Sequence, residues 1–352
     1  MKFSLFAGLV FVGVGFGQLM TDVQIFGSHN SYHAGLGKSE MAYLMKVNPK
    51  LAQSLDYSHP SLEEQLSMGV RKFEFDVFSD TKGGLFGKPA IVGLAAKAGL
   101  PADEAYSKLG VMGKPGFKVI HVQDLDYRSS CQPFVECLTI LRDWSKKHSR
   151  HLPIYVLVET KTGNPRPDFM VTPEVVTGET LDALDAEIRS VFETSQLITP
   201  DVVRGDFATL EEAVLRRGWP SLESGRGKVV FLFDQENVTG LYTKGRPILE
   251  GRVVFTNGKP GTPDAAFVKM NDATSERIAE LVKAGYLVRT MSDGVKDGKK
   301  RDAALASGAQ IVSTDYYFSK KSVSGYVVDF GGGIARCNPV RASDCKAASL
   351  VE

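Results

Sequence analysis

Residues 70–78 read VRKFEFDVF, and this stretch decides the fold class of the chain. Most of its positions are apolar, β-branched or aromatic, which predicts a buried strand. Glu74 and Asp76 are two residues apart within it, so their side chains point to the same face of the strand. Two carboxylates on one buried face repel each other unless a cation or a proton lies between them. The stretch therefore predicts a central strand that also carries chemistry.

Seven further segments have the character of buried strands, and segments of helical period separate them. We expect these strands at Val23–Gly27, Phe117–Val122, Ile154–Glu159, Val229–Asp234, Leu287–Met291 and Gln310–Thr314, with one more at either Val253–Thr256 or Ala266–Met270. We expect helices at Ser61–Met68, Gln132–His148, Thr180–Glu193, Thr209–Arg217, Ser275–Ala284 and Lys299–Ser307. Alternating strands and helices indicate parallel pairing with right-handed crossovers. Eight such units favour an α/β fold of the closed (β/α)8 TIM-barrel type over an open dinucleotide-binding sheet, since no GxGxxG follows the first strand.

The composition fits a single large globular chain. Its 352 residues include 42 Lys and Arg against 41 Asp and Glu, a formal net charge of +1. This balance argues against a nucleic-acid-binding protein that depends on bulk positive charge. The length permits two domains or one barrel, and we expect one catalytic barrel over residues 18–330 that acts as a monomer.

Residues 1–17 have the layout of a secretory signal peptide. Met1 and Lys2 precede an apolar run, Phe3 to Phe16, that is shorter than the roughly 20 residues needed to span a bilayer. We therefore expect the mature protein to be secreted or periplasmic.

The four cysteines are expected to form disulfides, because their number is even and the chain is expected to be exported. Of the three possible pairings we prefer the two local pairs, Cys131 with Cys137 and Cys337 with Cys345. A zinc site is less favoured, since no CxxC is present.

Two segments fall outside the barrel units. Residues 82–116 are rich in Gly, Ala, Lys and Pro and are interpreted as an insertion after the second strand. Residues 331–352 contain three consecutive glycines and the second cysteine pair, and we expect them to form a disulfide-stapled tail.

Polar residues gather where the predicted strands end, and in a parallel barrel this rim carries the active site. The first strand leads into GSHNSYH at residues 27–33, the third ends in His121 and the fourth in Glu159. With Glu74, Asp76 and Asn30, Glu159 makes a set of four oxygen donors, which suits a hard cation. Calcium takes six to eight oxygens and is favoured over magnesium, which demands stricter geometry. Zinc would more often recruit His or Cys.

Two histidines, His29 and His121, would flank this cation. Histidine titrates near neutral pH, which suits acid–base chemistry or charge stabilisation at a phosphodiester. A bound cation lowers the pKa of an attacking hydroxyl and neutralises phosphoryl oxygens. The ordered set predicts metal-assisted phosphodiester cleavage.

The set also resembles the catalytic domain of the phosphoinositide-specific phospholipases C, and in particular their calcium-dependent bacterial branch. The phrases that carry the resemblance are GSHNSYH, GVRKFEFDVFSD, FKVIHVQDLDYRSSC, IYVLVETK, RTMSDG and GAQIVSTDYY. The resemblance implies that His29 and His121 are the catalytic histidines and that calcium is held by four residues, Asn30, Glu74, Asp76 and Glu159. It also implies attack of the inositol 2-hydroxyl on phosphorus, departure of diacylglycerol and formation of an inositol cyclic phosphate. The substrate would be a phospholipid at a membrane surface.

Three further residues are secondary candidates for contact with substrate. Lys161 shares the face of Glu159 and could meet a phosphate or form an interior ion pair. Arg289 could hydrogen-bond phosphate or inositol hydroxyls, and Tyr316 could stack on the inositol ring or simply pack. The basic cluster at 296–301 is a candidate for contact with an anionic membrane, although a solvated loop and helix start is the favoured interpretation.

The remaining histidines are interpreted as exposed residues without a function. These are His33, His59, His148 and His151. Two other functions stay open: a glycerophosphodiester phosphodiesterase or sphingomyelinase D-like enzyme, and a binding protein that holds inositol phosphates without turnover. The pair His29 and Asn30 argues against the glycerophosphodiesterases, members of the same barrel superfamily that more typically carry HRG there.

Overall fold

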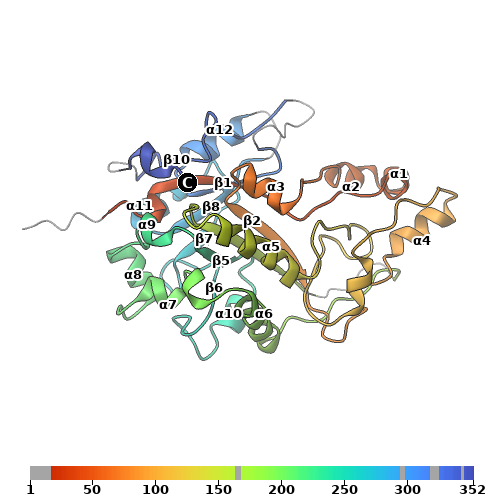
Figure 1. Ribbon diagram of the computed structural model, residues 1–352, viewed down its shortest axis with the longest axis horizontal. Coiled ribbons are helices and arrows are strands. Elements are labelled where there is room, and N and C mark those ends of the chain that lie inside the picture. Colours follow the sequence, from red (N-terminus) through yellow and green to blue (C-terminus); the bar gives the residue numbers. More distant parts are fainter. Residues whose placement is uncertain (1–16, 163–167, 294–297, 318–324, 342–344) are drawn as a thin grey trace, which may run out of the picture.

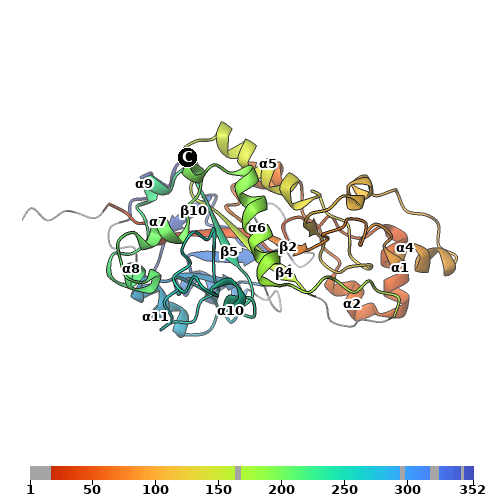
Figure 2. The same cartoon turned by 90° about the horizontal axis from the view of Figure 1, so that it is seen from below.

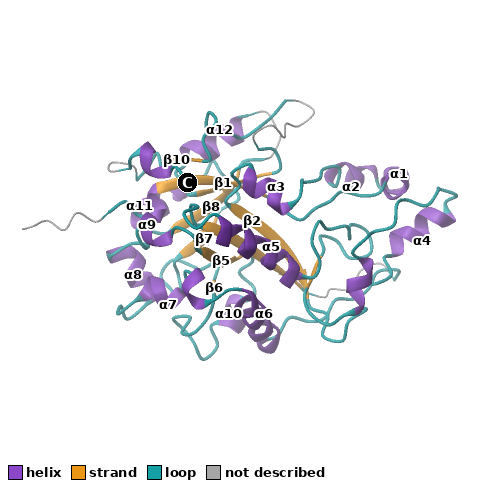
Figure 3. Cartoon of the chain, viewed as in Figure 1, coloured by secondary structure: helices purple, strands orange, loops and turns teal. Residues whose placement is uncertain are grey.

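A computed structural model describes residues 17–162, 168–293, 298–317, 325–341 and 345–352 (Figure 1). The expected signal peptide, up to residue 16, and residues 296–297 of the basic cluster lie outside these ranges. Figure 3 shows the strands gathered at the centre of the larger part of the molecule, with helices around them. No helix among the described residues is long and apolar enough to cross a membrane.

Eight parallel strands form the barrel. They are β1 (Val23–Ser28), β2 (Lys72–Phe78), β4 (Ile154–Lys161), β5 (Val229–Phe233), β6 (Val254–Phe255), β7 (Phe267–Lys269), β8 (Leu287–Met291) and β9 (Ile311–Thr314). Their order is β6-β5-β4-β2-β1-β9-β8-β7, and a parallel bridge between Asn257 and Phe267 joins the two ends of this path. The predicted (β/α)8 barrel is confirmed.

The prediction that Phe117–Val122 forms a strand of the barrel is wrong. Within Phe117–Val122 only β3 (Lys118–Val119) is a strand, and it pairs antiparallel with the end of β2. Val122 then forms an antiparallel bridge with Asp126, so the chain turns back on itself outside the barrel. The barrel reaches eight strands because both 253–256 and 266–270 contain one. An apolar run of this length shows that a segment is buried, but not which neighbour it pairs with.

The six predicted helices are all present. They are α3 (Leu62–Ser67), α5 (Phe134–Lys147), α6 (Gly178–Val191), α8 (Leu210–Arg216), α11 (Arg277–Ala284) and α12 (Lys299–Ala306). Their ends follow local chemistry: Ser61 caps α3 by accepting a hydrogen bond from the Glu64 N–H, and α11 ends at Gly285 with φ of +119°. Figure 2 shows α5 and α6 on the outer side of β2 and β4.

Short elements that the sequence did not predict complete this part of the fold. They are α7 (Pro200–Arg204), α9 (Leu222–Gly225), α10 (Thr239–Tyr242), and the 3-10 helices η1 (Met20–Asp22), η3 (Thr194–Gln196) and η5 (Ala347–Leu350).

The connections that follow β1, β2 and β4 build a second body beside the barrel. We call residues 34–58, 82–128 and 168–175 the outer lobe. It contains α1 (Lys38–Val47), α2 (Pro49–Ser54), α4 (Ala90–Lys97), η2 (Leu109–Gly113) and β3, and it forms one end of the molecule in two perpendicular views (Figures 1 and 2). It has its own hydrophobic cluster, which includes Leu44, Phe78, Phe86, Ile91 and Met112. The predicted insertion at 82–116 is thus part of a larger unit.

The C-terminal segment adds a strand to the barrel wall. β10 (Ala335–Cys337) pairs antiparallel with the first half of β1. Both predicted disulfides are present, Cys131–Cys137 and Cys337–Cys345.

Candidate active site

Two residues with special backbone requirements, Gly27 and Asn30, shape the turn after β1. A Cβ on Gly27 would lie 2.3 Å from Cβ of Lys72, so only glycine lets β1 approach β2 here. Asn30 has φ of +45°, a left-handed conformation that asparagine tolerates. The next residue, Ser31, donates its N–H to the Glu74 carbonyl and accepts the Glu74 N–H on its Oγ. These bonds hold the GSHNSYH turn against β2.

His29 lies between two carboxylates. Its Nδ1 is 3.2 Å from Oδ1 of Asp315, which follows β9, and its Nε2 is 3.7 Å from Oε1 of Glu74. Burial by itself would lower the pKa of His29, but Glu74 and Asp315 outweigh it and raise the pKa to about 9. The pKa of Asp315 is lowered, because His29 and His59 outweigh its own burial. The side chain of His29 is still 31% exposed, so it can reach a substrate.

Glu74 is held by cations inside the barrel. It forms an ion pair with the fully buried Lys72, and Nη2 of Arg289 lies 3.2 Å from its Oε2. Arg289 also donates from Nε to Oγ of Ser313 and from Nη1 to Asn271. Burial would raise the pKa of Glu74, but Lys72 and His29 outweigh it and hold the pKa below its ordinary value.

Asp76 and Glu159 are paired in register on the neighbouring strands β2 and β4. Nζ of Lys161 lies 2.9 Å from an oxygen of each carboxylate. Asp76 is 1% exposed, and beyond this ion pair to Oδ2 its carboxylate oxygens have no hydrogen-bond partner within the described part of the chain. Burial and Asp76 raise the pKa of Glu159 to about 7. This pair therefore forms an acidic centre that one ammonium group does not satisfy.

His121 is the second histidine at this rim, and Asp126 holds it. Its Nδ1 lies 2.7 Å from Oδ2 of Asp126, and Nε2 of the fully buried His33 lies 2.7 Å from the same oxygen. Burial would raise the pKa of Asp126, but its contacts with His121 and His33 lower it. The His121 side chain is 22% exposed and projects from the outer lobe, not from a barrel strand.

Asn30 and Tyr57 connect the two histidine groups. The Asn30 amide donates from Nδ2 to the Tyr57 hydroxyl over 2.8 Å, so its oxygen is the atom that it offers as a ligand. The Tyr57 ring stacks on His33 at 4.2 Å and lies 6.5 Å from the His29 ring. The structure thus places His29, Asn30, Glu74, Asp76, Glu159 and His121 along one rim.

Comparison with known families identifies the chain. The family described as "Phosphoinositide phospholipase C, Ca2+-dependent" matches residues 19–339. The chain belongs to this family. It is therefore a phosphoinositide-specific phospholipase C, as its motifs indicated, and it shares the family's calcium dependence. A search of curated protein sequences gave no match.

Solved structures of similar fold include phospholipases C from two bacterial genera. The calcium-dependent phosphoinositol-specific phospholipase C of a Pseudomonas species, in a myoinositol complex, has a TM-score of 0.58 at 14% identity, covering 92% of this chain and 96% of that one. A second crystal form of that enzyme has the same TM-score and identity over 92% and 97%. The calcium-dependent enzyme of Streptomyces antibioticus has a TM-score of 0.49 at 17% identity over 85% and 95%. At such identities the Pseudomonas structures support the fold alone.

The predictions for the other histidines of this phospholipase C and for Tyr316 have different outcomes. His33, His59 and His151 are buried, so their interpretation as exposed residues is wrong, whereas His148 is exposed as expected. Tyr316 packs edge-on against Tyr326, with ring centroids 6.0 Å apart, and its contact with substrate stays a prediction.

Sequence reasoning assigned no role to the residues that support the two histidines, namely Asp126, Asp315, Tyr57 and His59. Asp126 follows His121 by five residues and is, with Asp124, one of the two acids that follow His121 closely along the chain. Tyr57 and His59 carry no such signal, because they reach the site through the fold of the outer lobe.

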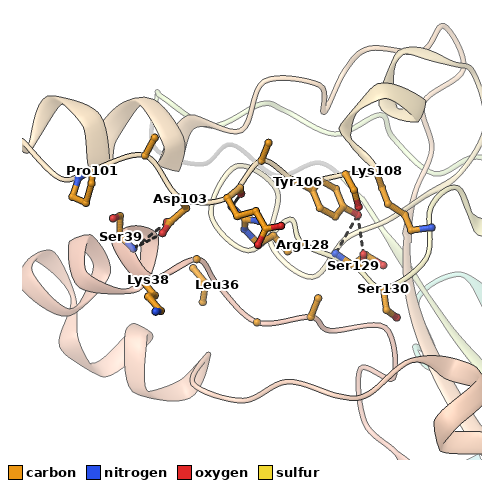
Figure 4. A pocket seen from close by; sticks show the side chains of 17 residues that line it. Leu36, Lys38, Ser39, Pro101, Asp103, Tyr106, Lys108, Arg128, Ser129 and Ser130 are labelled. Atoms are coloured by element: carbon orange, nitrogen blue, oxygen red, sulfur yellow. Dashed lines mark hydrogen bonds between the residues drawn. The ribbon is translucent and has the colours of Figure 1, made fainter.

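Two hollows lie on this side of the molecule. One, of about 350 Å³, borders His121 and Lys161, and both polar and apolar residues line the rest of it, among them Gln123, Phe78 and Leu125. The other, of about 730 Å³, lies within the outer lobe (Figure 4). There Asp103 accepts hydrogen bonds from the first N–H groups of α1, and Arg128 pairs with Glu40. The smaller hollow is therefore the one that adjoins the chemistry.

Proposed function

We propose that this phospholipase C cleaves phosphatidylinositol by attack of the inositol 2-hydroxyl on phosphorus. The P–O bond to the 2-oxygen forms, the P–O bond to glycerol breaks, and diacylglycerol and an inositol cyclic phosphate result. The observation that carries the proposal is the placement of His29 and His121, each held by a carboxylate, along the rim that also carries Asp76 and Glu159.

The residues present fit a calcium ion. Asp76 offers two buried oxygens beside the Glu159 carboxylate, and among the described residues the ion pair of Oδ2 with Lys161 is their one polar contact. We propose that Asp76, Glu159 and Asn30 hold the ion, with Glu74 at its edge because Lys72 and Arg289 already neutralise that carboxylate. When bound, calcium neutralises phosphoryl oxygens and acidifies the attacking hydroxyl. Magnesium is the less favoured ion.

The two histidines face different parts of the substrate in this proposal. His29, protonated between Glu74 and Asp315, stabilises charge on the phosphoryl group, and the Glu74 carboxylate accepts the proton of the 2-hydroxyl. His121 borders the partly apolar hollow, which suits the diacylglycerol side, so it gives a proton to the leaving glycerol oxygen.

The secondary candidates divide by their contacts. Lys161 borders the hollow beside His121 and is proposed to contact the substrate phosphate. Arg289 is buried and bonded to Glu74, Ser313 and Asn271, which favours a part in holding Glu74. Tyr316 keeps its proposed contact with the inositol ring.

We further propose that the enzyme acts as a secreted or periplasmic monomer after removal of residues 1–17. Two disulfides support an oxidising compartment. N-terminal sequencing of exported protein tests the cleavage point, and sedimentation tests the oligomeric state.

Release of water-soluble inositol phosphate from phosphatidylinositol vesicles tests the function, with calcium or with a chelator. We expect release that needs calcium, and loss of at least about 100-fold in His29→Ala and in His121→Ala. His148→Ala, at an exposed histidine, is the matched control and keeps activity. Phosphorus NMR of the product distinguishes the cyclic from the open phosphate. Turnover of glycerophosphodiesters instead, or of neither substrate, would reject the proposal.

A further inference from the structure

The end of the outer lobe exposes apolar side chains unlike the rest of the surface. Among the described residues, six of the ten exposed large hydrophobic side chains belong to this lobe. Val47 on α1 is 55% exposed and Val92 on α4 is 50% exposed. The helices α1 and α4 pack against each other and lie at the same end of the molecule (Figures 1 and 2). Scattered single residues would need no explanation, but four of these six lie on α1, α4 and η2.

The solvent face of α4 is apolar along its whole length. The helix reads AIVGLAAK, so Lys97 at its end is its one charged residue. Ile91 and Ala95 pack inward, whereas Val92, Gly93 and Ala96 face solvent. Beside them runs a groove of about 310 Å³ lined by Val92, Ala96 and Leu109. A helix that is apolar on its outer face lacks the polar stripe of a surface helix.

The charge of the outer lobe indicates which partner covers this face. Its described segments carry seven exposed lysines against three exposed acidic residues. Lys38 and Lys46 on α1 and Lys97 on α4 flank the apolar side chains. Two of the lobe's acids are already used, since Glu40 pairs with Arg128 and Asp103 caps α1. Apolar groups ringed by lysines match an anionic lipid surface.

We propose that the α1 and α4 end of the outer lobe docks on an anionic phospholipid bilayer. The lobe is built from the connections after β1, β2 and β4, so its docking face belongs to the same end of the barrel as His29 and His121. The proposal deepens the proposed function, on which it rests for the lipid substrate. Val47 and Val92 enter the headgroup region, and the lysines pair with lipid phosphates and carboxylates.

Co-sedimentation with vesicles of phosphatidylcholine and phosphatidylserine, without phosphatidylinositol, tests docking without turnover. We expect Val47→Ser with Val92→Ser, and separately Lys46→Gln with Lys97→Gln, to weaken binding by roughly tenfold. The matched control is Val202→Ser with Leu215→Ser, which changes two equally exposed apolar residues on α7 and α8. The control should bind within about twofold of wild type, and the lysine variant should lose most of the salt dependence.

Activity on two forms of the substrate separates docking from chemistry. The outer-lobe variants should lose roughly tenfold on phosphatidylinositol vesicles and keep full activity on monomeric short-chain phosphatidylinositol. Vesicle binding that is lost equally in the control, or unchanged in both outer-lobe variants, overturns the proposal. So does a change of oligomeric state in the outer-lobe variants without lipid, which would make this face an interface between copies. If phosphatidylinositol is never cleaved but phosphatidylserine binding depends on the lobe, docking stands and the proposed function fails.

Discussion

Asp126 shares one carboxylate oxygen between two histidines, and only His121 reaches the surface of the site. A carboxylate at Nδ1 fixes the imidazole ring so that Nε2 faces outward. We expect Asp126→Asn to lower kcat by about 100-fold and to leave KM for a monomeric substrate nearly unchanged, since the ring stays in place but loses its preferred tautomer. Steady-state kinetics on short-chain phosphatidylinositol provide the measurement.

Asp182→Asn is the control for this substitution, because Asp182 is an exposed acid on α6 that also forms an ion pair, with Arg252, and contacts neither histidine. If Asp126→Asn changes KM but not kcat, or if Asp182→Asn lowers kcat by as much, then Asp126 does not position His121.

Asp76 leads to a prediction about metal binding that does not use activity. Calcium that binds only the folded protein stabilises it by mass action. We expect calcium to raise the Tm of the wild-type enzyme, and Asp76→Asn to abolish most of this rise, because the variant removes one buried anionic ligand. Thermal unfolding with and without calcium provides the measurement. An unchanged calcium-dependent rise in the variant would place the ion elsewhere.

At the scale of the element, the segment after α5 makes stability depend on pH. His151 is buried with Nδ1 2.6 Å from the Leu152 carbonyl and Nε2 2.7 Å from Oγ of Ser145. Burial lowers its pKa to about 4. Between about pH 6.5 and pH 4, His151 is therefore protonated in the unfolded chain but neutral in the folded chain. The free energy of unfolding is highest above this range of pH and decreases as the pH falls through it.

The expected loss is up to about 3 kcal/mol in the free energy of unfolding between pH 7 and pH 4. His151→Gln should flatten this part of the pH dependence, whereas His148→Gln, at the exposed neighbour, should not. Urea unfolding of the three proteins at several pH values provides the measurement. If the free energy of unfolding depends on pH in the same way in wild type and in His151→Gln, His151 is not the source of this pH dependence.

The elements also show how far the sequence could be interpreted. β2 and β4 are buried on both faces over many residues, so their apolar runs predicted them as strands. Asp76 was found within the first of these runs and Glu159 at the end of the second. β3 has only two residues. Phe117 and Val119 pack into the hydrophobic core of the barrel and Ile120 into that of the outer lobe, so a local pattern could not distinguish this run from a barrel strand. α1 and α2 were missed for a related reason, since their short apolar faces pack within the lobe.

The histidines show the same limit at the site. His29 and His121 follow apolar runs and were found, whereas His33 and His59 lie in polar stretches that look exposed. His33 is buried by Asp126, 93 residues away, and His59 contacts Tyr317, 258 residues away. Only the folded chain brings such distant partners together.

At the scale of the whole molecule, the barrel and the outer lobe have separate hydrophobic cores. Phe86 is buried in the lobe and packs on Phe78 with ring centroids 5.1 Å apart. We expect Phe86→Ala to destabilise the lobe by about 3 to 4 kcal/mol and to leave the barrel strands protected. Amide hydrogen exchange, resolved by segment, provides the measurement.

Phe231→Ala is the matched substitution in the barrel core. It should increase exchange throughout the barrel strands. An equal increase everywhere in Phe86→Ala would show instead that the two cores unfold as one unit.

The C-terminal strand β10 lies against the first half of β1, and the chain ends over the barrel, away from the outer lobe (Figure 1). An affinity tag or a surface linker attached after Glu352 would therefore hold the barrel and leave the α1 and α4 helices pointing into solution. An enzyme immobilised in this way on a sensor chip would expose the outer lobe to vesicles in the flow, whereas attachment through a lysine of the lobe would cover the lobe.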